Sequence, residues 1–390
     1  MPLHNKNDET FDRMYQTGYL IILALIVFAG FLNTTMFPVR IPDRVLKILC
    51  AALCVLIVFR CVWKKRPENV KQTLGVCAIF ACMAASWLVT RHGYLLELAF
   101  LILGACGVPF RRILKVYLGV SVPFLAVTVC MALTGHIQNL VFYRGDQIRM
   151  SFGIHYPTDF CAHIFFLVCC WVWLRAERIT LAETVLIALT AVFCYVMCGA
   201  RTTMLCLLLL AGLLAVVRRL KHTGIGILKK ILLAGVPLSC VLSVALAYLY
   251  RESSPLMVKI NALLSNRPRL GHIGLQRYPL VLFGQIVEMQ GSGGTTEVPE
   301  NYFFLDSSYM YILLCLGICT LLAVMIILFK ASLEAYRADR FAALAVLAVL
   351  CLECFMEHHL ISIGYHPFLL LFAAGRELTE AGTIQGAGEP

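Results

Sequence analysis

Apolar segments long enough to cross a lipid bilayer recur along most of this 390-residue chain. A helix needs about 20 apolar residues to cross the roughly 30 Å of hydrocarbon in a bilayer. The residues are 60% hydrophobic and only 14% charged, and the mean hydropathy is +0.83. A soluble chain could not cover that much apolar surface with so few charges. We therefore predict an all-α polytopic membrane protein, with residues 1–390 forming a single integral membrane domain.

The apolar pattern predicts twelve transmembrane helices, at 18–37, 45–63, 72–90, 93–108, 113–133, 157–174, 180–198, 202–217, 227–250, 306–329, 341–355 and 361–374. Most of the 33 lysines and arginines then fall in loops on one side, which the positive-inside rule assigns to the cytosol. This predicts a multi-pass protein of the cell membrane with both termini cytosolic. The basic clusters flank membrane spans, so the net charge of +11 indicates lipid phosphates as partners and no nucleic acid.

Two polar stretches remain outside the predicted spans, a long extracytoplasmic loop at 251–305 and a shorter one at 134–156. None of the 18 cysteines lies in the long loop, so we expect no disulfide there. Ser254 followed by Pro255 is typical of a helix start. The apolar residues that follow at helical spacing predict a short amphipathic helix on the bilayer surface.

Arginines on the predicted outer side could bind phosphate groups. Arg201 lies between two apolar segments, and Arg267 and Arg269 lie in the long loop. A guanidinium donates two parallel hydrogen bonds to phosphate oxygens, which suits a pyrophosphate. Arg149 adds to this positive set. The alternatives are an arginine that reaches the membrane interface and solvated loop charges.

Acids and histidines also cluster near the predicted outer ends of spans. Asp306 could accept a proton from an attacking hydroxyl, orient that hydroxyl, or cap a helix. His155, Glu357, His358 and His366 are candidates for lining a cavity. The paired histidines suggest zinc, but no third and fourth ligand follows at a recognisable spacing. We predict no metal site and no cofactor.

The sequence has no nucleotide-binding glycine motif and no kinase or hydrolase signature. Any bond formed at an outer site must therefore use a donor that was activated before it arrived. A sugar attached to a lipid pyrophosphate meets that condition.

Five segments together resemble the O-antigen polymerase and O-antigen ligase superfamily, especially the capsular and exopolysaccharide polymerases of Gram-positive bacteria. The segments are 149–157, Gly-x-Arg-Thr at Arg201, Asn266-Arg267, 305–309 with Gly317, and Glu357 with Tyr365-His366-Pro367. The resemblance covers roughly Arg144 to Leu371.

This resemblance implies a helical fold of the membrane glycosyltransferase (GT-C) type. It also implies inverting, metal-independent transfer from an undecaprenyl-pyrophosphate donor held by Arg201 and Arg267, with Tyr309 near the cavity. The ligases carry a histidine where this chain has Asp306, which argues against a lipid A ligase.

The expected function is therefore a polysaccharide polymerase that extends an undecaprenyl-pyrophosphate-linked oligosaccharide, with a flippase and a chain-length regulator as pathway partners. An O-antigen ligase-type transfer to another acceptor, a lipid-linked oligosaccharide transporter or flippase, and a membrane scaffold are the alternatives. A transporter would show charges near the membrane midplane and discontinuous helices.

Overall fold

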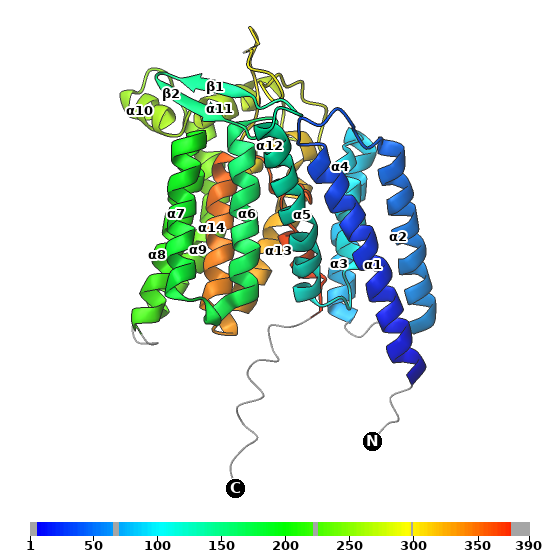
Figure 1. The fold of residues 1–390 in the computed structure, drawn as a ribbon. Helices are drawn as coiled ribbons and strands as arrows, with labels where there is room; N and C mark the ends of the chain where they lie inside the picture. The colour runs from blue at the N-terminus through cyan, green and yellow to red at the C-terminus, as the bar shows by residue number, and fades with distance from the viewer. Residues whose placement is uncertain (1–5, 65–69, 221–224, 298, 376–390) are drawn as a thin grey trace.

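The computed structural model describes residues 6–64, 70–220, 225–297 and 299–375, and most of its helices run side by side between two ends of the molecule (Figure 1). Within these ranges, nine helices are long and apolar enough to cross a membrane. They are α1 (Lys6–Leu32), α2 (Asp43–Lys64), α3 (Val70–Thr90), α5 (Phe110–Leu133), α6 (Pro157–Arg175), α7 (Leu181–Cys198), α8 (Arg201–Leu220), α9 (Ile225–Leu249) and α13 (Ile318–Arg337). The prediction of a helical, polytopic membrane protein is confirmed. The count of twelve spans stays a prediction.

The two ends of the bundle differ in structure. One end, which we call the loop end, carries the antiparallel hairpin of β1 (Val141–Arg144) and β2 (Gln147–Met150), with α10 (Pro255–Leu263) and α11 (Arg267–Arg277) (Figure 1, top). The shorter predicted loop thus contains a β-hairpin, a small exception to the all-α prediction. The chain ends, 1–5 and 376–390, lie outside the described residues, and the cytosolic placement of the termini stays a prediction.

Helix α10 begins where the sequence indicated. Ser254 is its N-cap residue, and its hydroxyl accepts a hydrogen bond from the Met257 N–H at 3.4 Å, with Pro255 in the first turn. Leu256 and Leu263 are 64% and 78% exposed. An exposed apolar face is what a helix resting on a bilayer surface requires.

The helix predicted at 306–329 is broken. It consists of α12 (Ser308–Tyr311), a π-helical turn η2 (Ile312–Leu316) and then α13, with Gly317 between them at φ +91°. A Cβ on Gly317 would lie 2.4 Å from the backbone of Leu282 and Gly284, so only glycine allows this approach. The apolar composition could not reveal the break, because every residue of η2 is still buried.

Backbone groups freed by this break find partners elsewhere in the chain. The N–H groups of Ile318 and Cys319 donate to the carbonyls of Val281 and Leu282, both at 3.0 Å. The Cys315 carbonyl accepts from the Gln285 N–H at 3.0 Å, and the Leu316 carbonyl accepts from the Ser86 hydroxyl at 2.8 Å. A non-helical segment is tolerated at membrane depth only when its polar groups are satisfied in this way.

Two shorter apolar helices, α4 (Gly93–Gly104) and α14 (Phe341–Met356), also run between the ends. The α-helix predicted at 361–374 is wrong. Turns and a 3₁₀ helix, η3 (Phe368–Phe372), occupy this stretch instead. Pro367 offers no N–H for a helix and disfavours a helical conformation at His366. The stretch stays buried, and its Gly375 N–H reaches the Val108 carbonyl at the end opposite the loops.

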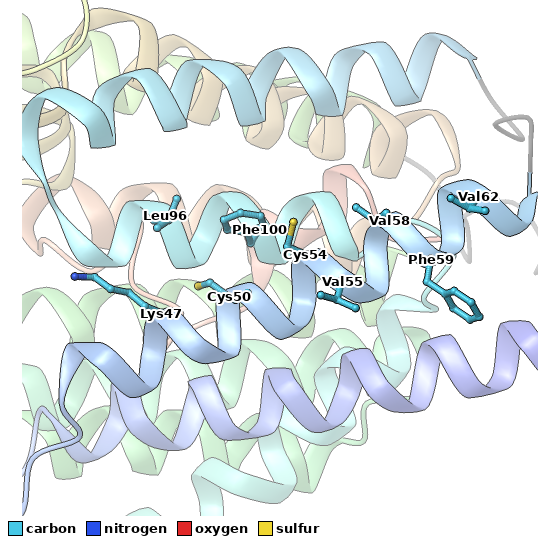
Figure 2. A pocket seen from close by; sticks show the side chains of 10 residues that line it. Lys47, Cys50, Cys54, Val55, Val58, Phe59, Val62, Leu96 and Phe100 are labelled. Carbon is cyan, nitrogen blue, oxygen red and sulfur yellow. The ribbon is translucent and has the colours of Figure 1, made fainter.

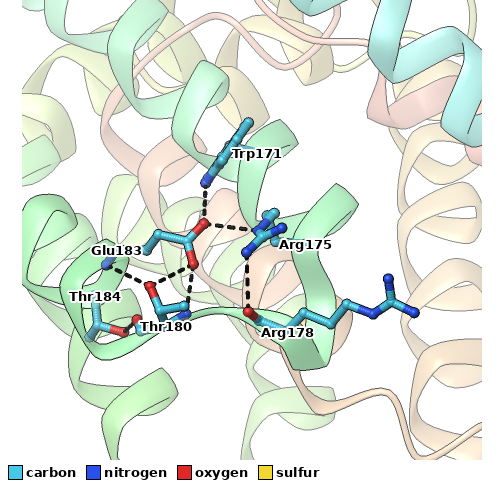
Figure 3. Close-up of polar contacts among 6 residues, drawn as sticks. All are labelled: Trp171, Arg175, Arg178, Thr180, Glu183 and Thr184. Atoms are coloured by element: carbon cyan, nitrogen blue, oxygen red, sulfur yellow. Dashed lines mark hydrogen bonds and ion pairs between the residues drawn. The ribbon is translucent and has the colours of Figure 1, made fainter.

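At the end opposite the loops, a polar network ends α6 and starts α7 (Figure 3). Thr180 and Glu183 form a capping box, in which each side chain bonds the other residue's backbone N–H. Glu183 also accepts hydrogen bonds from Arg175 at 2.9 Å and Trp171 at 3.2 Å, across the short 3₁₀ helix η1 (Ala176–Arg178). This network fixes the turn that brings α7 back towards the loop end.

An apolar groove of about 620 Å³ lies between α2 and α4 (Figure 2). Cys50, Cys54 and Val58 of α2 line it with Leu96 and Phe100 of α4. The groove lies on the α1–α4 side of the bundle, away from α7 and α8 (Figure 1). We expect lipid chains to fill it.

Candidate functional site

Four arginines from segments far apart in the sequence come together at the loop end. Arg144 ends β1, Arg149 belongs to β2, Arg201 is the first residue of α8, and Arg267 is the first residue of α11. The pKa of Arg144 is lowered, first by desolvation and then by the positive charges of the other three. Such a cluster of like charges favours an anion as its partner. The four residues are called the arginine cluster below.

Arg149 is held rigidly and keeps one donor free. Its side chain is 2% exposed, its Nε donates to the Cys198 carbonyl at 2.8 Å, and its guanidinium lies 5.4 Å from the centre of the Tyr156 ring. Its Nη2 is buried without a hydrogen-bond partner among the described residues. A buried donor without a partner in the protein points to a ligand that supplies one.

Gly199 makes room for this arginine. It ends α7 in the left-handed region at φ +63°, and a Cβ at this position would lie 2.9 Å from Nε of Arg149. The same turn places Arg201 at the start of α8, where the helix dipole also favours an anion. Arg201 is exposed and has no side-chain hydrogen bond within the described part of the chain.

Arg267 connects the long loop to two carboxylates. Its Nη2 lies 3.2 Å from Asp306 Oδ2 and 3.9 Å from Glu357 Oε1. Its Nε donates to the Met356 carbonyl at 3.2 Å, and its Nη1 to the Ser265 carbonyl at 2.9 Å. Burial disfavours the charge on Arg267, but the two carboxylates outweigh it and raise the pKa. Arg267 therefore stays charged and fixed.

Asp306 forms this ion pair and does not cap a helix. The N-cap residue of α12 is Ser307, and no side chain caps that helix. The neighbouring residues anchor the segment, because Ser307 bonds Ser243 at 2.8 Å and Ser308 donates to the Glu357 carbonyl at 2.5 Å. The Asp306 side chain is 18% exposed, so its carboxylate remains open to a substrate.

Glu357 and its neighbours form a second polar group beside Arg267. Burial raises the pKa of Glu357 well above its ordinary value, and burial lowers that of His358 to about 4. The His358 ring packs edge-on against Phe304, 5.0 Å between centres. His155 lies at the loop end, with its Nε2 3.0 Å from Arg40 Nη2.

Three of the predicted site residues lie elsewhere. Arg269 turns away from the cluster and pairs with Glu252 at 3.3 Å, with its side chain 49% exposed. Tyr309 is fully buried, and its hydroxyl bonds Ser239 and the Cys351 carbonyl. His366 is 2% exposed and packs against Phe166. Tyr309 and His366 pack in the helix core.

Sequence reasoning missed Arg144 as a site residue and Asp159 as a neighbour of Glu357. Arg144 stood out from the sequence only as one of the outer basic residues that the membrane orientation does not explain. Asp159 is the third residue of α6, where a carboxylate is common because it complements the helix dipole. Pairing either residue with the others requires the tertiary structure.

No family model, no curated protein and no solved structure matches this chain. The chemistry of the loop-end site is that of an anion receptor next to a carboxylate. The arginine cluster can bind a polyanion, and Asp306 can accept a proton or orient a hydroxyl.

Proposed function

We propose that this chain is a membrane glycosyltransferase of the GT-C type that polymerises lipid-linked glycans. It transfers a glycan from an undecaprenyl-pyrophosphate donor to a sugar hydroxyl of a lipid-linked repeat unit. The convergence of Arg144, Arg149, Arg201 and Arg267 at one end of a membrane-embedded bundle carries this proposal. A pyrophosphate on a lipid is an anion that reaches such a site from within the bilayer.

The arginines would bind the leaving group. Within the described residues, Nη2 of Arg149 and the guanidinium of Arg201 have no hydrogen-bond partner, so both offer donors to phosphate oxygens. As the bond between the sugar C1 and the pyrophosphate oxygen breaks, the electron pair moves to that oxygen. Fixed positive charges stabilise the charge that develops there, so the reacting atoms need no metal.

Asp306 would act on the acceptor. Its carboxylate takes the proton of the acceptor hydroxyl while that oxygen attacks C1 from the face opposite the pyrophosphate, which inverts the configuration. The ion pair with Arg267 at 3.2 Å holds the Asp306 carboxylate beside the arginine cluster. One residue, Arg267, thus links the anion site to the proton acceptor.

Transfer would take place on the outer face of the cell membrane, with both termini in the cytosol. A flippase would then deliver the lipid-linked repeat unit, and a chain-length regulator would set the product size. A ligase that passes the glycan to another acceptor would use the same residues.

A lipid-linked oligosaccharide transporter is the second candidate, because the helix that contains η2 and Gly317 is discontinuous. Broken helices near the membrane midplane are typical of transporters. The break here has its backbone groups bonded to protein, however, which leaves few of them for a transported substrate.

The test uses the purified full chain in detergent with a synthetic lipid-pyrophosphate repeat unit and no nucleotide. A ladder of longer lipid-linked glycans is expected, and Asp306→Asn should abolish it while leaving the protein folded. Transfer to an added acceptor without a ladder would indicate a ligase. Tight lipid binding without any transfer would overturn the enzyme proposal and favour transport.

A further inference from the structure

Three potential metal ligands converge beside the arginine cluster. Asp159 comes from the first turn of α6, and Glu357 and His359 come from the turn that follows α14. One ligand atom from each lies within 4.8 Å of the others, and Asp159 Oδ1 is 3.4 Å from His359 Nε2. Ligand atoms that share a cation at about 2.0–2.2 Å lie roughly 3–4 Å apart. The 3.4 Å between Asp159 and His359 falls in this range, and Glu357 lies near enough to complete the group after a small side-chain shift.

The histidine nitrogen in this group has no hydrogen-bond partner among the described residues. His359 is 1% exposed, and its Nε2 makes no hydrogen bond within the described part of the chain. A buried nitrogen of this kind is costly unless something binds it. Its lone pair is a natural ligand for a metal ion.

The two acidic side chains of the group also favour a cation. Asp159 and Glu357 place two carboxylates close together, with side chains 15% and 6% exposed. The guanidinium of Arg267 lies 3.9 Å from Glu357, but it is closer to Asp306, at 3.2 Å. A divalent ion would relieve the repulsion between the two carboxylates.

A stack of rings holds His359 in place. Its ring lies parallel to the Tyr365 ring at 3.7 Å, and Tyr365 stacks in turn on His163 at 4.0 Å. The His358 ring lies beside the His359 ring at a tilt of 44°, with ring centres 4.3 Å apart. A ligand whose orientation is fixed before binding loses little entropy when the ion arrives.

We propose that Asp159, Glu357 and His359 bind one divalent transition-metal ion, Zn²⁺ or Mn²⁺. One imidazole nitrogen and two carboxylate oxygens suit these ions better than Ca²⁺, which takes oxygen ligands only. The ion would join α6 to the turn after α14 and fix Glu357 next to Arg267. This proposal concerns metal binding and stands independently of the transferase activity.

The experiment measures metal content and affinity in the full chain. The purified protein is stripped with a chelator and then titrated with Zn²⁺ or Mn²⁺, with Mn²⁺ binding followed by electron paramagnetic resonance. We expect about one ion per chain and a higher thermal midpoint with metal. Asp159→Asn, Glu357→Gln and His359→Phe should each weaken binding about 10-fold or more. His359→Phe keeps a ring on Tyr365 and removes both ring nitrogens, the ligand atom among them.

His272→Asn and Glu288→Gln are matched controls, because they alter the same residue types outside the group. Both should bind metal like the unmodified chain. The proposal is overturned if the unmodified chain binds no ion, which would leave a proton between Asp159 and His359. It is also overturned if the three ligand variants bind as well as the two controls. A bound ion with unchanged transfer after chelation would support the site and confine its role to structure.

Discussion

The guanidinium of Arg267 lies 3.2 Å from the carboxylate of Asp306, and this contact joins the start of α11 to the segment just before α12. Both side chains are mostly buried, at 17% and 18% exposure. The pair brings together a residue suited to hold phosphate and a residue suited to accept a proton. Substituting Arg267 or Asp306 one at a time can therefore test the site.

Arg267→Lys should lower transfer about 100-fold, because lysine keeps the charge but loses the paired donors of the guanidinium. Arg267→Ala should also reduce the free energy of unfolding by about 3 kcal/mol, since it leaves Asp306 and Glu357 without their cation. Initial rates with the lipid-pyrophosphate substrate and thermal unfolding in detergent measure the two effects. Arg269→Ala is the control, because its exposed pair with Glu252 contributes only about 0–1 kcal/mol. Equal losses for both alanine variants would remove Arg267 from the site.

Gly199→Ala should weaken binding of a lipid-pyrophosphate analogue and reduce stability by at least about 1 kcal/mol. The new Cβ would lie 2.9 Å from Nε of Arg149, at a backbone φ of +63°. Gly212→Ala in α8 is the matched control, because a Cβ there meets no described atom within 4 Å apart from its chain neighbours and its own helix backbone. It should be neutral or stabilising by up to about 1 kcal/mol. Unchanged analogue binding in Gly199→Ala would show that Arg149 does not contact the pyrophosphate.

His155 should make the stability depend on pH. Burial and the nearby Arg40 lower its pKa, with Asp159 acting in the opposite direction. Between this lowered pKa and about 6.5, the unfolded chain binds more protons than the folded one, so stability rises with pH in that window. The thermal midpoint should therefore fall on acidification below about pH 6.5.

The His155→Asn variant should lose this part of the pH dependence, and Arg40→Ala should reduce it. Thermal midpoints across the acidic range compare the three proteins. A pH profile of His155→Asn identical to that of the unmodified chain would contradict the prediction.

Gly317→Ala should destabilise the protein by more than about 3 kcal/mol, because its Cβ would overlap the backbone of Leu282 and Gly284. The hydrogen bonds that join α13 to Val281 and Leu282 would then separate. Gly235→Ala in α9 has open space around its Cβ and serves as the control. Size-exclusion profiles and thermal midpoints in detergent measure both. A stable, monodisperse Gly317→Ala variant would show that the break can be closed.

Composition and local sequence patterns predicted much of the architecture. Apolar segments of sufficient length predicted the long helices of the described residues, except that α13 begins at Ile318 and not at 306. Ser254 with Pro255 predicted the start of α10. These predictions depend on the hydrophobic effect and on backbone hydrogen bonding within a few residues. The breaks at Gly317 and at 361–374 were missed, because a buried non-helical segment is as apolar as a buried helix.

The candidate site was likewise predicted in part from the sequence and decided in part by the tertiary structure. The residue types and the predicted outer side of the membrane singled out Arg149, Arg201, Arg267 and Asp306 from the sequence alone. Only the tertiary structure decided that Arg267 pairs with Asp306, that Arg269 turns to Glu252, and that Asp159 meets His359. Local sequence sets where each charge stands along the chain. Which charges meet depends on how separate helices pack, and no local pattern encodes that.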